Sequence, residues 1–433
     1  MTEQREESGL PNAARFVKDF LRGSTYTFST AIADIVDNSI EAGATEINIE
    51  VVYEANQVVI MDNGEGMTDA VHFEAMKVAA ETRDYSESDL GRYGTGMKSA
   101  SLSQARRLVV ATRPKTSKQT TVRALDVDHV IATNDWDRLT QVLTVEALPS
   151  FVKEHLADKT GTAVIWENLD KVFGDKGLTP QKQREELVKQ ADLTAQHLSR
   201  VFHKFIAGEV DGVEPISISV NSQSLEAWDP FARAESTQLL AERDVVIGSQ
   251  GGSAHVTSYV LPGEKEFSSP DAWAKAKGNK PWIDGQGFYV YRNGRLICWG
   301  GWFGMRSKEA HNSLARVSFE FSSELDEILK VPVDKSSIVL PQVTKIVLKP
   351  IVEEVGSKAN ERYRNQKKLT PANTSDLPGR HNMPAVVKRK LTASALVDAL
   401  ERAAAVNGLG EELSTLKRAL RQTNAKIADE VDW

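Results

Sequence analysis

The sequence predicts an α+β protein whose N-terminal part combines helices with a mixed sheet. Three observations lead to this fold class. A helix-forming stretch at 31–42 precedes two alternating strands at 46–53 and 57–61, short β runs dominate from residue 214, and helical periodicity returns after residue 356. Helices and strands that share the chain in this way, without a regular βαβ repeat, are typical of α+β domains.

The composition bounds the possible classes of protein. The chain has 433 residues, enough for two or three domains. Its net charge of −7 argues against a surface that is basic throughout, although a local basic channel would not show in the sum. Cys298 is the only cysteine, so no intramolecular disulfide can form. Residues 1–9 do not resemble a signal peptide and no apolar run approaches membrane-spanning length, so we expect a cytoplasmic protein with no membrane partner.

The first long helix carries an acid and an amide on one face. Asp34 and Asn38 lie four residues apart in the stretch 31–42, which Gly43 ends, and the apolar residues point the other way. Polar groups beside so much apolar surface need partners. A nucleotide with its metal would supply them, because the carboxylate could orient a water and the amide oxygen could bind Mg²⁺. The alternative is a helix end whose polar residues face solvent.

The turn Asp-Asn-Gly-Glu-Gly-Met-Thr at 62–68 follows the second strand. The carboxylate of Asp62 could accept a hydrogen bond from the exocyclic amine of adenine, and Gly64 and Gly66 would let the backbone approach the base. Taken alone, this is a common kind of turn. Thr68 could cap a helix that runs to about Ala80.

A glycine-rich stretch, Gly-Arg-Tyr-Gly-Thr-Gly-Met-Lys-Ser at 91–99, opens the next helix at 97–104. Such a loop presents backbone N–H groups to phosphates. The spacing of Gly91 and Gly96 is that of a P-loop, but Met97 intrudes before the lysine, and no clear strand precedes the loop. We therefore reject a P-loop and interpret the stretch, with the polar loop 81–96, as a mobile lid that faces phosphates.

The remaining elements complete two parts and a tail. In the first part we expect a helix at 13–21, strands at 108–112, 120–126, 141–146 and 163–166, and a closing helix at 180–206. In the second part we expect strands at 216–220, 245–248, 255–260 and 287–291, a hairpin turn at Asn293-Gly294, and helices at 319–329 and 342–355, with Lys335 in the loop between them. Prolines then mark a linker before helices at 391–406 and 411–431, which could pack on their own protein or form a dimeric coil.

Four of these stretches, at 31–44, 62–68, 91–101 and 161–162, resemble in order and spacing the motifs of the GHKL ATPases, the superfamily of gyrase, chaperone, histidine kinase and MutL proteins. Asp-Asn-Ser-Ile-Glu-Ala-Gly-Ala and Gly-Arg-Tyr-Gly-Thr-Gly-Met-Lys-Ser-Ala-Ser look most like the prokaryotic MORC (microrchidia) branch. The resemblance implies a GHKL (Bergerat) α/β sandwich with an N-terminal arm at 1–207, a ribosomal-protein-like transducer domain at 208–356, and a linker with C-terminal helices at 357–433.

The resemblance also implies the cofactors ATP and Mg²⁺ and a set of site residues. Asn38 would hold the metal, Asp62 would bind adenine and Thr162 would support Asp62. Lys335 would reach the γ-phosphate, with Lys330 as the near alternative. The base pocket and the lid would be formed by Gly64, Gly66, Met67, Gly94, Thr95, Gly96, Met97, Lys98 and Ser99.

One position departs from the family pattern. Asp34 stands where a glutamate usually acts as general base, and its side chain is shorter by one methylene. Because a general base must come within hydrogen-bond reach of the water, turnover should be slow unless the helix lies closer to the nucleotide. Asp37 or Glu41 could share the role, although Glu41 is two turns further along.

Two functions follow from the resemblance. The favoured one is a Mg²⁺-dependent ATP hydrolase that dimerises on ATP binding and acts as a clamp, plausibly on DNA, with possible protein partners from a phage-defence, restriction-linked or repair system. The alternative is a nucleotide-dependent binding switch with little turnover. A chaperone-like ATPase is a weaker match. A sensor histidine kinase fits poorly, since no membrane segment or phospho-accepting histidine helix precedes the ATP-binding region.

Aromatic residues crowd one region of the second part, among several lysines. Such side chains could stack on single-stranded bases, but tryptophans more often fill the core of a small domain, and we favour the core. The residues are Trp273, Trp282, Trp299 and Trp302.

Overall fold

The computed structural model describes residues 12–23, 25–77, 96–135, 140–174, 177–247, 252–332, 335, 337–368 and 414. The chain divides into two compact units, Met1–Thr370 and Pro371–Trp433. Both sheets and every helix named below lie in the first unit. The linker and the helices expected at 391–406 and 411–431 lie, except for Ser414, outside the described residues.

The first sheet has eight strands in the order β5-β4-β3-β6-β2-β1-β7-β8. Every pair is antiparallel except β1 with β7, which is parallel, so the sheet is mixed as predicted. The strands are β1 (Glu46–Val52), β2 (Gln57–Asp62), β3 (Arg107–Arg113), β4 (Thr121–Asp126), β5 (Thr140–Leu143), β6 (Gly161–Glu167), β7 (Ser217–Val220) and β8 (Gln223–Ser224).

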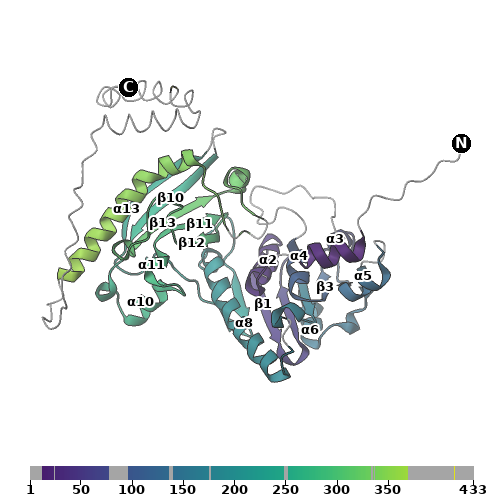
Figure 1. The fold of residues 1–433 in the computed structure, drawn as a ribbon. Helices are drawn as coiled ribbons and strands as arrows, with labels where there is room; N and C mark the ends of the chain where they lie inside the picture. Colours follow the sequence, from purple (N-terminus) through teal and green to yellow (C-terminus); the bar gives the residue numbers. More distant parts are fainter. Residues whose placement is uncertain are drawn as a thin grey trace. The chain divides into compact units, whose positions relative to one another are not determined.

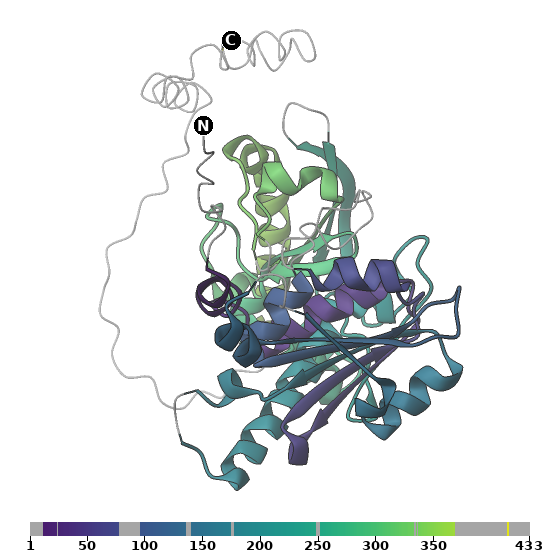
Figure 2. The same cartoon turned by 90° about the vertical axis from the view of Figure 1, so that its right-hand side faces the viewer.

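Helices cover both faces of this sheet (Figures 1 and 2). One face packs on α2 (Phe28–Glu41), α4 (Gly96–Gln104) and the long α8 (Pro180–Val201), and the other packs on α6 (Ser150–Asp158). The two faces alternate along β2, because Val58 and Ile60 join the first core whereas Val59 and Met61 join the second. The shorter helices of this part are α1 (Ala13–Arg15), the π-helix η1 (Phe16–Leu21), α3 (Asp69–Met76), α5 (Val127–Thr133), α7 (Asp170–Phe173) and α9 (His203–Ile206).

Helix α2 lies at the centre of the first core. The side chains of Thr27 and Thr30 cap it reciprocally, each bonding the other's backbone N–H, and Ala42 ends it just before Gly43, whose φ is +68°. Ten of its fourteen residues are buried, among them the two acids Asp34 and Asp37. A helix buried on nearly all sides keeps its place by packing, so its polar side chains must find partners inside the protein.

The second sheet has five strands in the order β12-β11-β13-β10-β9, with β11 parallel to β13. The strands are β9 (Gln238–Ile247), β10 (Gly252–Val260), β11 (Gly287–Arg292), β12 (Arg295–Trp299) and β13 (Ala315–Phe321). Helix α13 (Gln342–Lys368) packs along β10 and β13 (Figure 1), and shorter helices α10 (Pro270–Lys277), α11 (Trp282–Gly285) and α12 (Asp326–Leu329) surround the sheet. Trp302 is buried in this core, and Trp273 and Trp282 stack on each other against it.

Two segments differ from the sequence prediction. The strand expected at 216–220 in the second domain instead pairs with β1 of the first sheet, a pairing that local sequence cannot reveal. The α-helix expected at 319–329 is wrong over 319–325, since Phe319 and Phe321 belong to β13, Ser323–Leu325 form a 3-10 turn and α12 begins only at Asp326. Six of the seven residues of β13 are buried, and a strand buried on both faces lacks the period-2 pattern that distinguishes it from a helix.

No helix within the described ranges is long and apolar enough to cross a membrane. The loop expected at 81–96 falls almost entirely outside the described residues, as do Gly94 and Thr95 of the predicted lid. The domain boundaries at 207 and 356 stay predictions.

Two buried histidines should make the fold sensitive to acid. Burial lowers the pKa of His72 to about 4 and that of His203 to about 3, from 6.5. The unfolded chain takes up protons near pH 6.5 while the folded chain does not, so stability is lost as the pH falls below 6.5. At pH 5 we expect a loss of about 2 kcal/mol for each histidine.

Chemical denaturation of wild type and His203→Gln at pH 7 and pH 5 measures this loss. The variant should lose less stability than wild type between pH 7 and pH 5. Replacing the exposed His311 should leave the loss as in wild type. Equal losses in wild type and His203→Gln would contradict the role given to His203.

Candidate nucleotide site

The turn after β2 surrounds a buried carboxylate. Asp62 is 5% exposed, and one of its oxygens accepts the backbone N–H groups of Gly64 at 2.9 Å and Thr162 at 3.1 Å. The other oxygen accepts the hydroxyl of Ser39 on α2 at 2.9 Å. Burial raises the pKa of Asp62, and these three hydrogen bonds oppose the rise. A carboxylate offers about four acceptor positions, so one remains for a donor such as the exocyclic amine of adenine.

The glycines of this turn are needed by the chain itself. A Cβ at Gly66, whose φ is +66°, would lie 2.1 Å from the carbonyl oxygen of Arg113, and one at Gly64 would lie 2.8 Å from that of Ala42. We expected these glycines to allow the backbone to approach the base. The structure adds that they also allow neighbouring backbone segments to pack against the turn. The same holds for Gly161, where a Cβ would lie 1.9 Å from the carbonyl oxygen of Asp62.

A threonine on β3 connects the turn to β6. The Thr112 hydroxyl accepts the backbone N–H of Met67 at 2.8 Å and lies 3.1 Å from the hydroxyl of Thr162. Sequence analysis did not single out Thr112. Its only signal was its position at the end of a strand beside the one that Thr162 opens. The structure therefore brings Asp62, Met67 and Thr162 together through a fourth residue.

Asn38 and Asp34 lie one turn apart on α2 but in different surroundings. Asn38 is exposed, and none of the described residues hydrogen-bonds to its amide. An exposed amide oxygen next to a carboxylate is a suitable ligand for Mg²⁺, so the donor set at this position fits the metal. Asp34 is only 4% exposed, and the hydroxyl of Tyr26 donates to its Oδ2 at 2.5 Å.

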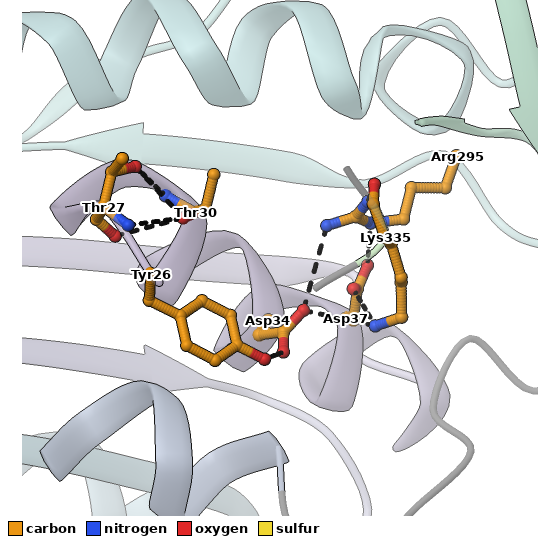
Figure 3. A network of polar contacts seen from close by, with 7 residues as sticks. All are labelled: Tyr26, Thr27, Thr30, Asp34, Asp37, Arg295 and Lys335. Carbon is orange, nitrogen blue, oxygen red and sulfur yellow. Dashed lines mark hydrogen bonds and ion pairs between the residues drawn. The ribbon is translucent and has the colours of Figure 1, made fainter. Parts of the chain in front are cut away.

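Two cations from the second sheet and its loops reach the acids of α2 (Figure 3). The ammonium of Lys335 lies 2.6 Å from Asp37 Oδ2 and 3.2 Å from Asp34 Oδ1. The guanidinium of Arg295 donates from Nε to Asp37 Oδ1 at 2.9 Å, and its Nη2 lies 3.9 Å from Asp34 Oδ1. All four side chains are buried. We call these residues, Asp34, Asp37, Arg295 and Lys335, the interlocking quartet.

The quartet bears on two choices that the sequence leaves open, among the acids of α2 and between Lys330 and Lys335. Burial raises the pKa of Asp37, but Arg295 and Lys335 outweigh it, and the net pKa is lowered. Each oxygen of Asp37 bonds to one of these cations, whereas Asp34 bonds to Lys335 through one oxygen and accepts the Tyr26 hydroxyl with the other. Of the two candidate lysines, Lys335 reaches α2, whereas Lys330 is exposed at the end of α12.

Helix α4 begins beside the acid. A Cβ at Gly96 would lie 3.4 Å from Asp34 Oδ2, so the first turn of α4 closes over that carboxylate. Met97 is half-buried against the first core and Ser99 is half-buried on the same helix. Lys98 differs from the expectation that it faces phosphates. It is buried, its Nζ donates to the carbonyl of Ala75 at 2.7 Å, and burial lowers its pKa to about 8.

Comparison with known proteins agrees with this geometry. Residues 26–162 match the family model described as "Histidine kinase-, DNA gyrase B-, and HSP90-like ATPase". The matched range begins at Tyr26, which bonds Asp34, and ends at Thr162, which bonds Asp62. It therefore includes both the acids of α2 and the Asp62 turn. The N-terminal region therefore contains a GHKL ATPase domain, which supports ATP binding and ATPase activity. No curated protein matches the chain.

Proposed function

We propose that the protein binds Mg²⁺ and ATP between α2, the Asp62 turn and the start of α4, and hydrolyses the nucleotide. The main support for the proposal is the position of the buried Lys335, which follows the last strand of the second sheet in the chain. Its ammonium lies 3.2 Å from Asp34 Oδ1 in the GHKL domain. A cation at this distance from the general-base position could bind a terminal phosphate and offset the negative charge that develops in phosphoryl transfer.

Each predicted residue has a role in this proposal. Asp62 binds adenine with support from Thr162, and Asn38 supplies an oxygen ligand to the metal, which neutralises phosphate charge when it is bound. Asp34 orients the attacking water and Lys335 contacts the γ-phosphate. The base pocket and lid consist of Gly64, Gly66, Met67, Gly94, Thr95, Gly96, Met97 and Ser99, and Lys98 anchors the first turn of α4 to the carbonyl of Ala75.

We further propose that ATP binding joins two chains into a homodimer that acts as a clamp on DNA, within a defence or repair system. These finer roles rest on the resemblance of residues 31–44 and 91–101 to prokaryotic MORC proteins. A second candidate, a binding switch with little turnover, is favoured by one observation: the short Asp34 side chain is engaged by both Tyr26 and Lys335.

Asn38→Ala tests the proposed site. Because the amide is exposed and bonds no described residue, the variant should unfold at the same denaturant concentration as wild type. Loss of the metal ligand should lower phosphate release by about 100-fold. Gln181→Ala, which removes an exposed amide at the start of α8, serves as the control and should hydrolyse ATP like wild type. Equal phosphate release in wild type and Asn38→Ala would refute the assignment.

A further inference from the structure

The interlocking quartet alternates cations and anions in a row. Arg295 contacts Asp37, Asp37 contacts Lys335, and Lys335 contacts Asp34, which also accepts the hydroxyl of Tyr26 and lies 3.9 Å from Arg295 (Figure 3). Two positive and two negative charges balance inside the protein. Buried charges are tolerated when each keeps a partner of opposite charge. The loss of any one member therefore leaves a neighbouring buried charge with fewer partners.

The two cations are held very differently. Arg295 begins β12 directly after the Asn293-Gly294 turn, its Nη1 donates to the carbonyl oxygen of Lys335 at 3.4 Å, and its guanidinium lies 5.8 Å from the ring of Phe202. The ammonium of Lys335, by contrast, has no hydrogen bond among the described residues other than those to Asp34 and Asp37. It is carried by a backbone position in the left-handed region, with φ +47°. Among the described residues, the Arg295 side chain is thus fixed at several points, whereas the Lys335 ammonium is bonded only to the two carboxylates.

This difference determines what happens when Lys335 turns to another anion. Asp37 would still be paired with Arg295 at 2.9 Å, and Asp34 would still accept the hydroxyl of Tyr26. Without Arg295, Asp37 would depend on Lys335 alone, and moving the lysine would leave a fully buried carboxylate unpaired. Arg295 therefore lowers the cost of releasing Lys335.

We propose that Arg295 is a positioning residue of the ATPase: it is the permanent counter-ion of Asp37, and so allows Lys335 to exchange between the acids of α2 and the terminal phosphate of ATP. The inference rests on the proposed function, in which Lys335 binds that phosphate. Since ADP has no γ-phosphate, the exchange contributes to the binding of ATP and not of ADP.

Arg295→Gln should therefore change nucleotide discrimination. With Asp37 holding Lys335 more tightly, the affinity for a non-hydrolysable ATP analogue should fall by about tenfold, while the affinity for ADP stays the same. Asp37→Asn should act in the opposite direction, because it removes a competitor for Lys335 and raises the affinity for the analogue alone. Titration calorimetry of the full-length protein with Mg²⁺ and each nucleotide measures both.

A matched control lies three residues away. Arg292 is buried and pairs with Asp326 through two bonds of 2.7 and 2.8 Å, so Arg292→Gln breaks a similar buried ion pair without touching α2. It should lower stability but leave the ratio of the two affinities as in wild type. Arg295→Lys keeps the positive charge and should retain part of the preference for the ATP analogue. It takes the place of Arg295→Gln if that variant folds poorly.

The double variant completes the design. In a protein that carries Asp37→Asn, Arg295 keeps only its longer contact with Asp34, at 3.9 Å, so adding Arg295→Gln should change the ratio much less than it does in wild type. An unchanged ratio in the single variant Arg295→Gln, with wild type preferring the ATP analogue, would overturn the inference and leave the proposed function standing. If wild type binds neither nucleotide, the proposed function fails and the inference fails with it.

Discussion

Asp34→Asn is expected to lower ATP turnover by about 10²–10⁴-fold, the usual contribution of a general base. The carboxylate is buried beside the first turn of α4 and one turn before Asn38, whereas both oxygens of Asp37 are engaged by cations. The substituted amide is nearly isosteric, so nucleotide binding should persist. Steady-state phosphate release and nucleotide titration separate the two effects.

Asp34→Glu then decides between the hydrolase and the switch. A loss of turnover means that the aspartate is already at the correct distance from the water, and a large gain means that the natural side chain is too short and that the protein acts mainly as a nucleotide-dependent switch. Asp192→Asn, on the exposed face of α8, is the control for the loss of one negative charge. If Asp34→Asn retains full turnover, neither account of Asp34 survives.

Gly161→Ala is expected to lower both stability and nucleotide affinity. Its φ is +140°, and the added Cβ would lie 1.9 Å from the carbonyl oxygen of Asp62, so backbone must move. We expect a loss of about 3 kcal/mol in the free energy of unfolding. Because Asp62 is the group displaced, ATP and ADP should be weakened alike, by about tenfold or more. Denaturant unfolding and calorimetry measure the two quantities.

Gly174→Ala separates backbone strain from the clash. Gly174 also has a positive φ, +60°, but a Cβ there would meet nothing within 4 Å. Its backbone, at φ +60° and ψ −169°, lies in a region that essentially only glycine adopts, so the variant should lose about 1–3 kcal/mol in the free energy of unfolding. Nucleotide affinity should stay unchanged, and a similar loss of affinity in both glycine variants would mean that contact with Asp62 is unimportant.

The local elements of the first sheet could be predicted because their patterns are unambiguous. The strands at 46–53 and 57–61 and the helix at 31–42 agree closely with β1, β2 and α2. Asp62 and Thr162, predicted as neighbours from the family resemblance, lie 3.1 Å apart through the Thr162 N–H. Short-range periodicity and motif order thus determined the GHKL part of the fold and one corner of the site.

The partners that complete the site could not be predicted. Arg295 is 258 residues from Asp37, and nothing in an Asn-Gly-Arg turn shows that its arginine enters another part of the protein. Tyr26 and Thr112 act through single hydroxyl groups, which leave no spacing pattern in a sequence. The buried position of Lys98 was missed for a related reason: a lysine in a glycine-rich stretch suggests a phosphate contact, and only packing against α3 reveals the carbonyl of Ala75.

The parallel pairing of β7 with β1 has a consequence for how the protein folds as it is made. The edge of the first sheet is closed by residues 217–224, which are synthesised after the long helix α8. Until they leave the ribosome, β1 has an unpaired edge, and unpaired edges invite association with other chains. A nascent chain that has already completed α2, the Asp62 turn and α4 is thus still exposed to misassembly, and the risk ends only when this short, distant strand docks.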